Sequence, residues 1–126
     1  MALVLDTGAL VAIDRGDRRV AALIEATRRR GEAVRTSSGC VAQAWRSGGP
    51  RQALLARTLK GIDESPLDPR ASRSIGALCM KAGSSDVIDA HVALLASHGD
   101  LVVSSDLDDL TALVRSARTR ATLHHC

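Results

Sequence analysis

The fold is decided by the run Ala2-Leu3-Val4-Leu5-Asp6-Thr7-Gly8 near the start of the chain. Its first four residues form a short continuous apolar run, which is typical of a strand buried on both faces of a parallel sheet. Asp6 ends this run, and Thr7-Gly8 turns the chain into a predicted helix over residues 8–14. Ligands of such sheets bind beyond the carboxyl ends of the strands. We therefore expect Asp6 to anchor an active site.

Strand and helix patterns alternate along the rest of the chain. Strands are predicted at 33–36 and 101–103, with edge strands between Pro66 and Pro69 and over 121–125. Helices are predicted from the cap Asp17 to Gly31, from Ser37 or Ser38 through Trp45, around Leu55, Leu59 and Ile62, from Ala71 to Ala82, over 86–97, and over 107–114. This alternation favours a parallel sheet covered on both faces. We expect one domain over residues 1–126, of the α/β class, a three-layer α/β/α sandwich with a central, mainly parallel, Rossmann-like sheet.

The composition is that of a soluble globular protein, with 45% apolar and 25% charged residues. Trp45 is the one aromatic residue, and the absence of Tyr and Phe argues against a stacking platform for single-stranded nucleic acid. The net charge of +3 is mildly basic and compatible with a nucleic-acid substrate. Much of it is Arg, whose planar fork suits phosphate, although a solvated helix face accounts for any one Arg as well.

The cysteines and the apolar segments bear on the compartment. Cys40, Cys79 and Cys126 are an odd number at wide spacing, which indicates neither a zinc site nor a disulfide framework. Asp6 interrupts the first apolar run and no basic segment precedes it, unlike a signal peptide. No stretch of ~18 apolar residues that could span a membrane is present. We expect a cytoplasmic protein with reduced thiols.

Acidic residues gather where this architecture would bring them together. Asp6 ends the first strand, and Asp106 ends the strand at 101–103, with Asp108 and Asp109 following at once. If these two strands are adjacent, Asp6 and Asp106 face one crevice. Taken singly, Asp86 and Asp106 are better accounted for as helix caps, and it is the whole set that points to a site.

Asp89 is harder to account for as a structural residue. It follows Asp86 by one helical turn, within a segment that is otherwise nearly all apolar. A carboxylate buried there is costly unless it is paired or bound to metal. Several carboxylates in one pocket favour a divalent cation, and oxygen ligands point to Mg²⁺ or Mn²⁺ rather than zinc. Metal ions held in this way commonly catalyse the hydrolysis of phosphodiesters.

Four segments resemble, in order and over essentially the whole chain, the PIN domain and more narrowly the VapC-type toxins of bacterial toxin–antitoxin modules. These segments are Leu5-Asp6-Thr7-Gly8-Ala9-Leu10, Thr36-Ser37 through Val41-Ala42-Gln43-Ala44-Trp45-Arg46, Ser85-Asp86-Val87-Ile88-Asp89-Ala90-His91, and Val103-Ser104-Ser105-Asp106-Leu107-Asp108-Asp109-Leu110. The resemblance implies a parallel sheet flanked by helices and a Mg²⁺- or Mn²⁺-dependent endoribonuclease that cleaves tRNA or another structured RNA and so inhibits translation. It also implies homodimers and a cognate VapB-type antitoxin that plugs the active site, in a heterotetramer or a larger assembly.

The resemblance assigns roles residue by residue. Asp6, Asp86 and Asp106 match the first, third and fourth acids of the family, and are the expected catalytic and metal-binding residues. Asp89 and Asp108 match accessory acids, and Ser104 matches a hydroxyl residue that supports the fourth acid. The second acid of the family is usually Glu, whereas the matching residue here is Gln43. Gln43 could ligate the metal through its amide oxygen, but it brings no charge.

Other interpretations of the sequence stay open. A PIN-fold binding protein with weakened catalysis is kept because of Gln43. Leu5-Asp6-Thr7-Gly8-Ala9 also matches the signature of retroviral-type aspartic proteases, whose nearly all-β fold does not suit this chain. An aspartyl-phosphate enzyme with Asp6 as nucleophile would want a second Asp where Gly8 stands. His91 is expected to be packed or hydrogen-bonded, with a role as general base as the alternative.

Overall fold

A five-stranded sheet runs through the middle of the molecule, and the computed structural model describes all residues 1–126. The strands are β1 (Leu3–Leu5), β2 (Val34–Ser37), β3 (Asp63–Ser65), β4 (Leu101–Ser104) and β5 (Thr122–His125). Their order is β3-β2-β1-β4-β5, and every neighbouring pair is parallel. The prediction of a mainly parallel sheet is confirmed, and the tail strand over 121–125 belongs to it.

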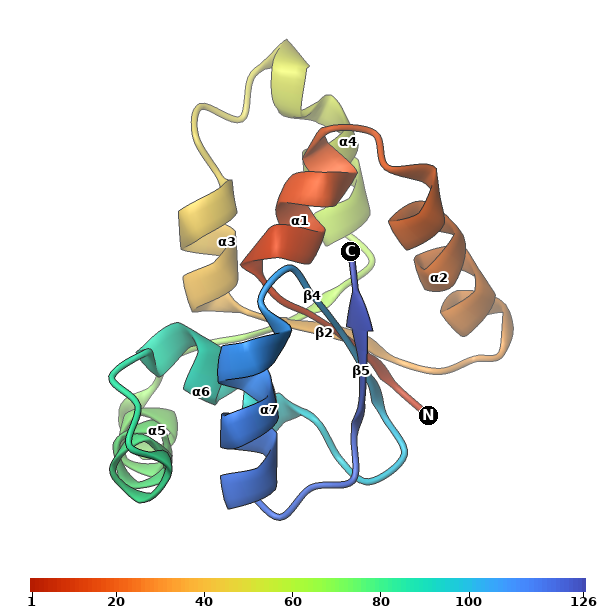
Figure 1. Ribbon diagram of the computed structural model, residues 1–126. Helices are drawn as coiled ribbons and strands as arrows, with labels where there is room; N and C mark the ends of the chain where they lie inside the picture. Colours follow the sequence, from red (N-terminus) through yellow and green to blue (C-terminus); the bar gives the residue numbers. More distant parts are fainter.

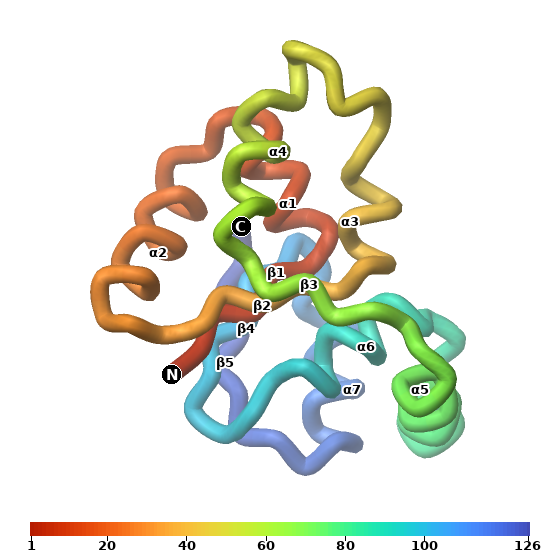
Figure 2. The backbone as a smooth tube through the Cα atoms, turned by 180° about the vertical axis from the view of Figure 1, so that it is seen from behind, coloured from red at the N-terminus to blue at the C-terminus, as the bar shows by residue number.

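Helices cover both faces of the sheet (Figure 1). One layer holds α1 (Thr7–Asp14), α2 (Arg18–Arg29), α3 (Ser38–Ala44) and α4 (Ala53–Leu59), the last preceded by a 3₁₀ turn (Pro50–Gln52). The other layer holds α5 (Pro69–Ala82), α6 (Val87–Leu95) and α7 (Leu107–Ser116). Seen from behind in Figure 2, the chain begins and ends at opposite ends of the strands. The expected three-layer α/β/α architecture is therefore present.

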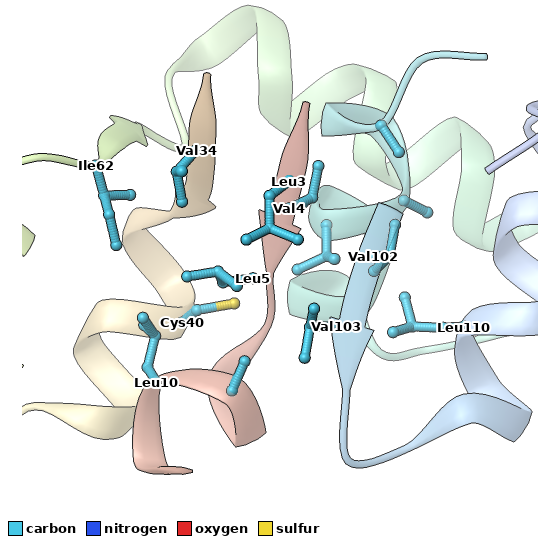
Figure 3. Close-up of a cluster of buried hydrophobic side chains, with 14 of the residues drawn as sticks. Leu3, Val4, Leu5, Leu10, Val34, Cys40, Ile62, Val102, Val103 and Leu110 are labelled. Carbon is cyan, nitrogen blue, oxygen red and sulfur yellow. The ribbon is translucent and has the colours of Figure 1, made fainter. Parts of the chain in front are cut away.

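The core lies where the central strands meet the two helix layers (Figure 3). It is a cluster of 25 buried apolar residues, and it includes all of β1, whose three residues are inaccessible to solvent. Leu10 of α1 packs from one layer and Leu110 of α7 from the other, both fully buried. Burying a Leu side chain contributes about 1.5–3 kcal/mol. The central strand therefore holds both helix layers in place.

The register of the central strands places Asp6 among polar residues of its neighbours. Leu5 of β1 lies opposite Thr36 of β2 and Val103 of β4. The backbone N–H of Asp6 donates to the carbonyl of Val103 at 3.1 Å, so Asp6 still belongs to the ladder. The strands that lead to Asp6 and Asp106 are adjacent, as the expected crevice between these two residues requires.

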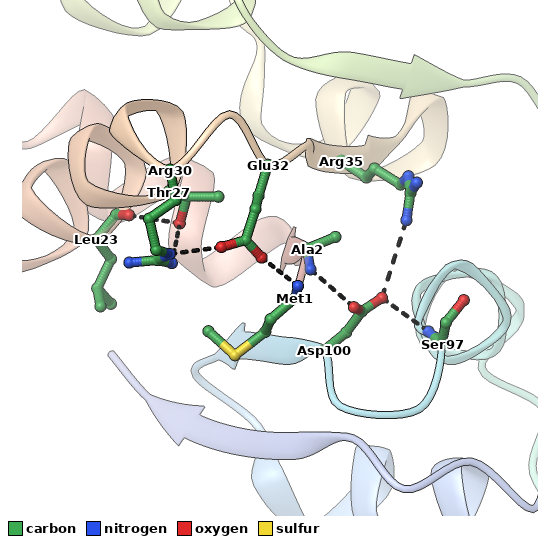
Figure 4. Close-up of polar contacts among 9 residues, drawn as sticks. All are labelled: Met1, Ala2, Leu23, Thr27, Arg30, Glu32, Arg35, Ser97 and Asp100. Atoms are coloured by element: carbon green, nitrogen blue, oxygen red, sulfur yellow. Dashed lines mark hydrogen bonds and ion pairs between the residues drawn. The ribbon is translucent and has the colours of Figure 1, made fainter.

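At the amino ends of the strands, Asp100 is tied into a network of donors (Figure 4). Its carboxylate accepts the backbone N–H groups of Ala2 and Ser97, each at 2.8 Å, and lies 3.8 Å from the Arg35 guanidinium. Nearby, Glu32 pairs with the amino terminus and with Arg30. These contacts fasten β1, β2 and β4 together at the end of the sheet opposite Asp6.

The edge strand expected between Pro66 and Pro69 was placed wrongly. It is β3, residues Asp63–Ser65, and it ends just before Pro66. Asp63 and Glu64 are exposed, so the strand carries no apolar run to mark it. Ile62, assigned by its spacing to the preceding helix, instead lies buried in the turn after α4.

The protease alternative fails on the architecture. Asp6-Thr7-Gly8 joins a central parallel strand to a helix, and the sheet contains no antiparallel pair. A nearly all-β fold is thus absent. None of the helices combines the length and the apolar character that a membrane crossing requires.

Candidate metal centre

Three helices begin at carboxylates near the carboxyl end of the sheet. Asp6, Asp86 and Asp106 occupy the N-cap positions of α1, α6 and α7. Asp6 accepts the N–H of Ala9 at 2.9 Å, and Asp86 accepts that of Asp89 at 3.0 Å, whereas the side chain of Asp106 makes no capping bond. Helix N-termini stabilise negative charge, so the ends of these helices favour a group of acids that would otherwise repel one another.

Asp6 is the most deeply placed of these acids, with 3% of its surface exposed. Burial raises its pKa above the usual value, because the charged form loses hydration. The Ser104 hydroxyl and the backbone N–H groups of Gly8, Ala9 and Ser105 hydrogen-bond to the carboxylate and oppose this rise in pKa. The site therefore supplies donors to Asp6 without fully offsetting the cost of burying its charge.

Two small residues let the first turn of α1 pack against the segment that leads to Asp106. Gly8 lies so close to Ser105 that a Cβ at position 8 would overlap the Ser105 side chain. Ser104 accepts the backbone N–H of Asp106 at 2.8 Å and also bonds Asp6. The first turn of α1 and the junction between β4 and α7 are thereby held together. Ser104 supports both acids, as the resemblance implied for the fourth.

The acids open onto a cavity of about 600 Å³ between the first turns of the helices and the end of β5. Its lining is Asp6, Thr7, Gly8, Val11, Ala12, Arg15, Asp17, Gln43, Asp86, Asp89, Ser105, Asp106 and Cys126. Arg15 is the one basic residue among five carboxylates. The cavity is thus strongly acidic, in a chain whose net charge is positive.

A second grouping of acids lies at one side of this cavity. Oxygen atoms of Asp86, Asp89 and Asp109 lie within 4.8 Å of one another. Burial raises the pKa of the half-buried Asp89 to about 7, with the charges of Asp86, Asp6 and Asp106 contributing to the rise. The exposed Asp109 also has a raised pKa, mainly because of the charge on Asp106. Crowding of these carboxylates therefore contributes to the raised pKa of both Asp89 and Asp109.

Gln43 stands on α3 at the rim of the cavity. Its amide oxygen accepts a hydrogen bond from the Thr7 hydroxyl, which directly follows Asp6. The exposed side chain therefore reaches the site from a third helix, where the family usually has Glu. A second lone pair of the amide oxygen and both amide N–H groups remain available to solvent or ligand.

The structure gathers most of the acids that the sequence singled out. Asp6, Asp86, Asp89, Asp106 and Gln43 all line the same cavity. Asp108 does not line it, and the member of this segment that joins the cluster is Asp109.

The sequence placed Asp109 among the acids after the strand at 101–103 without giving it a role in the site, and Arg15 was missed. Asp109 stands three residues after the cap Asp106, as Asp89 does after Asp86, and this shared spacing was the available signal. Arg15 ends α1, and no pattern in the sequence marks it as a cavity residue.

His91 points away from the acids. It is buried, and its Nδ1 lies 2.6 Å from the Ser37 hydroxyl. It lines a different cavity, together with Asp68 and Ser74, and burial lowers its pKa. The hydrogen-bonded packing role expected for His91 agrees with this place, and the alternative of a general base at the acids does not.

Comparison with known proteins tests the fold independently of the site. No family model matches the sequence, and no curated protein matches it. Among solved structures, a chain of VapBC2 from Rickettsia felis, crystallised with a DNA fragment from the promoter, matches with a TM-score of 0.68. The match covers 100% of this chain and 99% of that chain at 15% sequence identity. The protein therefore has the PIN-like fold, which it shares over its whole length with a chain of a VapBC complex.

Proposed function

We propose that this protein is a VapC-type toxin, a Mg²⁺- or Mn²⁺-dependent endoribonuclease whose substrate is tRNA or another structured RNA and whose activity inhibits translation. The convergence of Asp6, Asp86, Asp89 and Asp106 on one open cavity at the carboxyl end of a PIN-like sheet carries this proposal. The likeness to a chain of VapBC2 supports it through the fold.

The donor set suits a hard divalent cation. Asp86, Asp89 and Asp109 offer only carboxylate oxygens within reach of one another, with Asp6 and Asp106 in the adjoining cavity. Mg²⁺ and Mn²⁺ prefer such ligands. Burial and the neighbouring carboxylates both raise the pKa of Asp89, and a cation bound among these acids would favour its charged form. When bound, the cation would supply charge stabilisation at the phosphate and activation of water.

The residues of the chain would orient the reaction around these acids. Asp6 is held by Ser104 and by backbone N–H groups, so its carboxylate is fixed before the substrate binds. Arg15, the one cation of the cavity, would contact a phosphate beside the scissile one. Gln43, fixed by Thr7, would hold a water or a ligand oxygen at the rim. Cleavage then depends on positioning by rigid helix ends.

The expected partners follow from the same proposal. The VapBC2 chain belongs to a complex that was crystallised on DNA. By analogy, this chain would pair with a VapB-type antitoxin that covers the acidic cavity with a basic or polar side chain. It would form a homodimer, and a heterotetramer or larger assembly with the antitoxin.

Gln43 favours one alternative function. Because the amide adds no charge where the family usually has Glu, metal affinity can fall until only binding remains. The chain would then be a PIN-fold binding protein. Metal titration and RNA cleavage, measured on the same preparation, distinguish this protein from the nuclease.

The test is cleavage of bulk tRNA by the purified chain with Mn²⁺ or with a chelator. A neighbouring pair of acids provides a matched comparison, since Asp109 joins the acidic cluster and Asp108 does not. We expect cleavage only with the metal, a loss on Asp109→Asn, and near wild-type cleavage on Asp108→Asn. Equal cleavage with the chelator and with Mn²⁺, or no cleavage with Mn²⁺, would contradict the nuclease.

A further inference from the structure

Trp45 is placed unusually for the one aromatic residue of the chain. It caps the C-terminus of α3, and 37% of its surface is exposed. Exposed indole rings are uncommon away from binding surfaces, because the ring offers a large apolar area and one polar N–H. Trp45 belongs neither to the hydrophobic core nor to the lining of the acidic cavity.

The loop that carries Trp45 is built around a buried glutamine. Gln52 is 5% exposed, and its amide oxygen accepts the backbone N–H groups of Arg46 and Gly48, each at 3.0 Å. Its amide nitrogen donates to the carbonyl of Ala44 at 3.1 Å and to Asp14 at 3.3 Å. Buried amides with all these bonds made give a loop one defined conformation. Residues 44–52 therefore form a fixed platform.

Gly48 fits the tryptophan ring into this platform. Its φ of 64° lies in the left-handed region, and a Cβ there would overlap the benzo half of the Trp45 ring. The ring therefore packs directly against the glycine backbone while part of it stays exposed. The platform presents an aromatic surface in one orientation, at little entropic cost on binding.

The surroundings of Trp45 carry positive charge. Arg46 and Arg51 both follow Trp45 along the chain and are exposed, and Arg46 donates to the Trp45 carbonyl at 3.0 Å. The segment 33–62 contains no acidic residue. Gln43, two residues before Trp45, lines the acidic cavity, so the ring lies within about one helical turn of its rim. A polyanion bound at the Gln43 side of the cavity would therefore lie within reach of this platform.

We propose that Trp45 stacks on an unpaired base of the RNA while Arg46 and Arg51 contact the adjoining phosphates. This inference rests on the proposed ribonuclease function, and it names single-stranded or looped RNA as the bound form. The lack of other aromatic residues excludes an extended stacking platform, but one ring can take one base. The two exposed guanidinium groups, on a segment that carries no acid of its own, favour RNA over a protein partner as the occupant.

The chain is suited to a direct test, because Trp45 is its one tryptophan and it has no tyrosine. All its intrinsic fluorescence therefore reports on this ring. The probe is a short oligoadenylate, added to the Asp6→Asn protein so that cleavage does not intervene. We expect quenching of the emission by the oligoadenylate, and much weaker quenching by an abasic oligomer of equal length.

Variants separate stacking from charge. Trp45→Leu should weaken binding of labelled oligoadenylate by about 5- to 100-fold, the range expected for the loss of one stacked base. Trp45→Phe should recover most of this loss, and Leu54→Ala, which trims another exposed apolar residue, should change little. Salt dependence should keep its slope in Trp45→Leu but fall by about 0.7 in Arg46→Ala, because only the latter releases a counterion.

The outcomes distinguish this inference from the function on which it rests. Cleavage of tRNA with unchanged emission and unchanged affinity of Trp45→Leu would overturn the stacking role alone. Emission that responds to an antitoxin but not to RNA would also overturn it, and would assign the platform to a protein. If the wild-type chain neither bound nor cut RNA, both proposals would fall.

Discussion

Asp6 and Asp100 are carboxylates with the same burial and opposite environments. They lie at the two ends of the central strands, 3% and 4% exposed. Asp100 is matched by two backbone N–H groups and an arginine, with no acid in its network. Asp6 shares a cavity with Asp17, Asp86, Asp89 and Asp106.

These two environments separate structural acids from functional ones. Burial alone does not, because a buried carboxylate is costly in either place unless it is compensated. At Asp100 the chain supplies the compensation itself. At Asp6 it supplies hydrogen bonds and then adds further negative charge, which destabilises the fold. Such local conflicts are expected at functional sites.

The largest effect we expect is on activity at the Asp6 end. Asp6→Asn should reduce RNA cleavage by more than about 100-fold. Replacing a residue that only supports a metal ligand already costs about 10- to 100-fold, and Asp6 is expected to be a ligand itself. Its thermal melting temperature in chelator should not fall, because burial already disfavours the charged form of Asp6. Cleavage within a few-fold of the wild type would remove Asp6 from the site.

Replacing Asp100, at the opposite end of the central strands, should lower the stability of the fold. Asp100→Ala leaves the N–H groups of Ala2 and Ser97 without partners, which should cost about 2–4 kcal/mol of unfolding free energy. Denaturant unfolding measures this loss, and Asp63→Ala, at an exposed edge-strand acid, is the control. Metal affinity of the folded fraction should stay as in the wild type. An Asp100→Ala protein as stable as the wild type would contradict the structural role of Asp100.

The pH dependence of stability should show the uncompensated charge. The pKa of Asp89 is about 7, far above that of an ordinary aspartate, so the folded chain keeps a proton which the unfolded chain releases. The stabilisation from this proton is present in acid and lost as the pH rises toward about 7. Between about pH 4 and about pH 7, melting temperatures in chelator should therefore fall by more in the wild type than in Asp89→Asn.

Mn²⁺ sharpens this pH test. A cation takes over the role of the proton, so the extra fall in the wild-type melting temperature should disappear when Mn²⁺ is present. Identical profiles for the wild type and Asp89→Asn would show that the carboxylates do not interact as their crowding indicates.

The smallest change is expected at Gln43. Gln43→Glu adds a carboxylate at the rim of the cavity and should tighten Mn²⁺ binding or raise the cleavage rate by about 10-fold, the scale of effects near metal ligands. Calorimetric titration and the tRNA assay measure the two. Gln52→Glu is unsuitable as a control for the added charge, because Gln52 is buried and a carboxylate there would disturb folding. No change in either quantity would mean that Gln43 does not face the metal.

Much of the fold could be predicted from the sequence because the central strands are apolar runs. Leu3-Val4-Leu5 and Leu101-Val102-Val103 are short runs of β-compatible apolar residues, and in the structure they fill the middle of the sheet between the two helix layers. β3 could not be placed in the same way. Its residues are mostly exposed and pair on one side only, so hydrophobicity does not mark it.

The site was predictable where one strand end or helix cap defines a residue, and less so elsewhere. Asp6 and Asp106 follow strands, and Asp86 precedes an apolar helix. The choice between Asp108 and Asp109 depends on where α7 begins, which the sequence leaves open by a residue or two. Arg15, and the fixed loop under Trp45, arise from contacts between segments distant in the chain, and local patterns do not encode them.

Direct titration of Mn²⁺ into the metal-free chain tests the central claim, that the acids around Asp6 form a metal site and Asp100 does not. Wild-type protein and folded Asp100→Asn protein should show the same saturable binding, and Asp6→Asn should bind far more weakly. Absence of binding by the wild type, or equal binding by Asp6→Asn, would contradict the account.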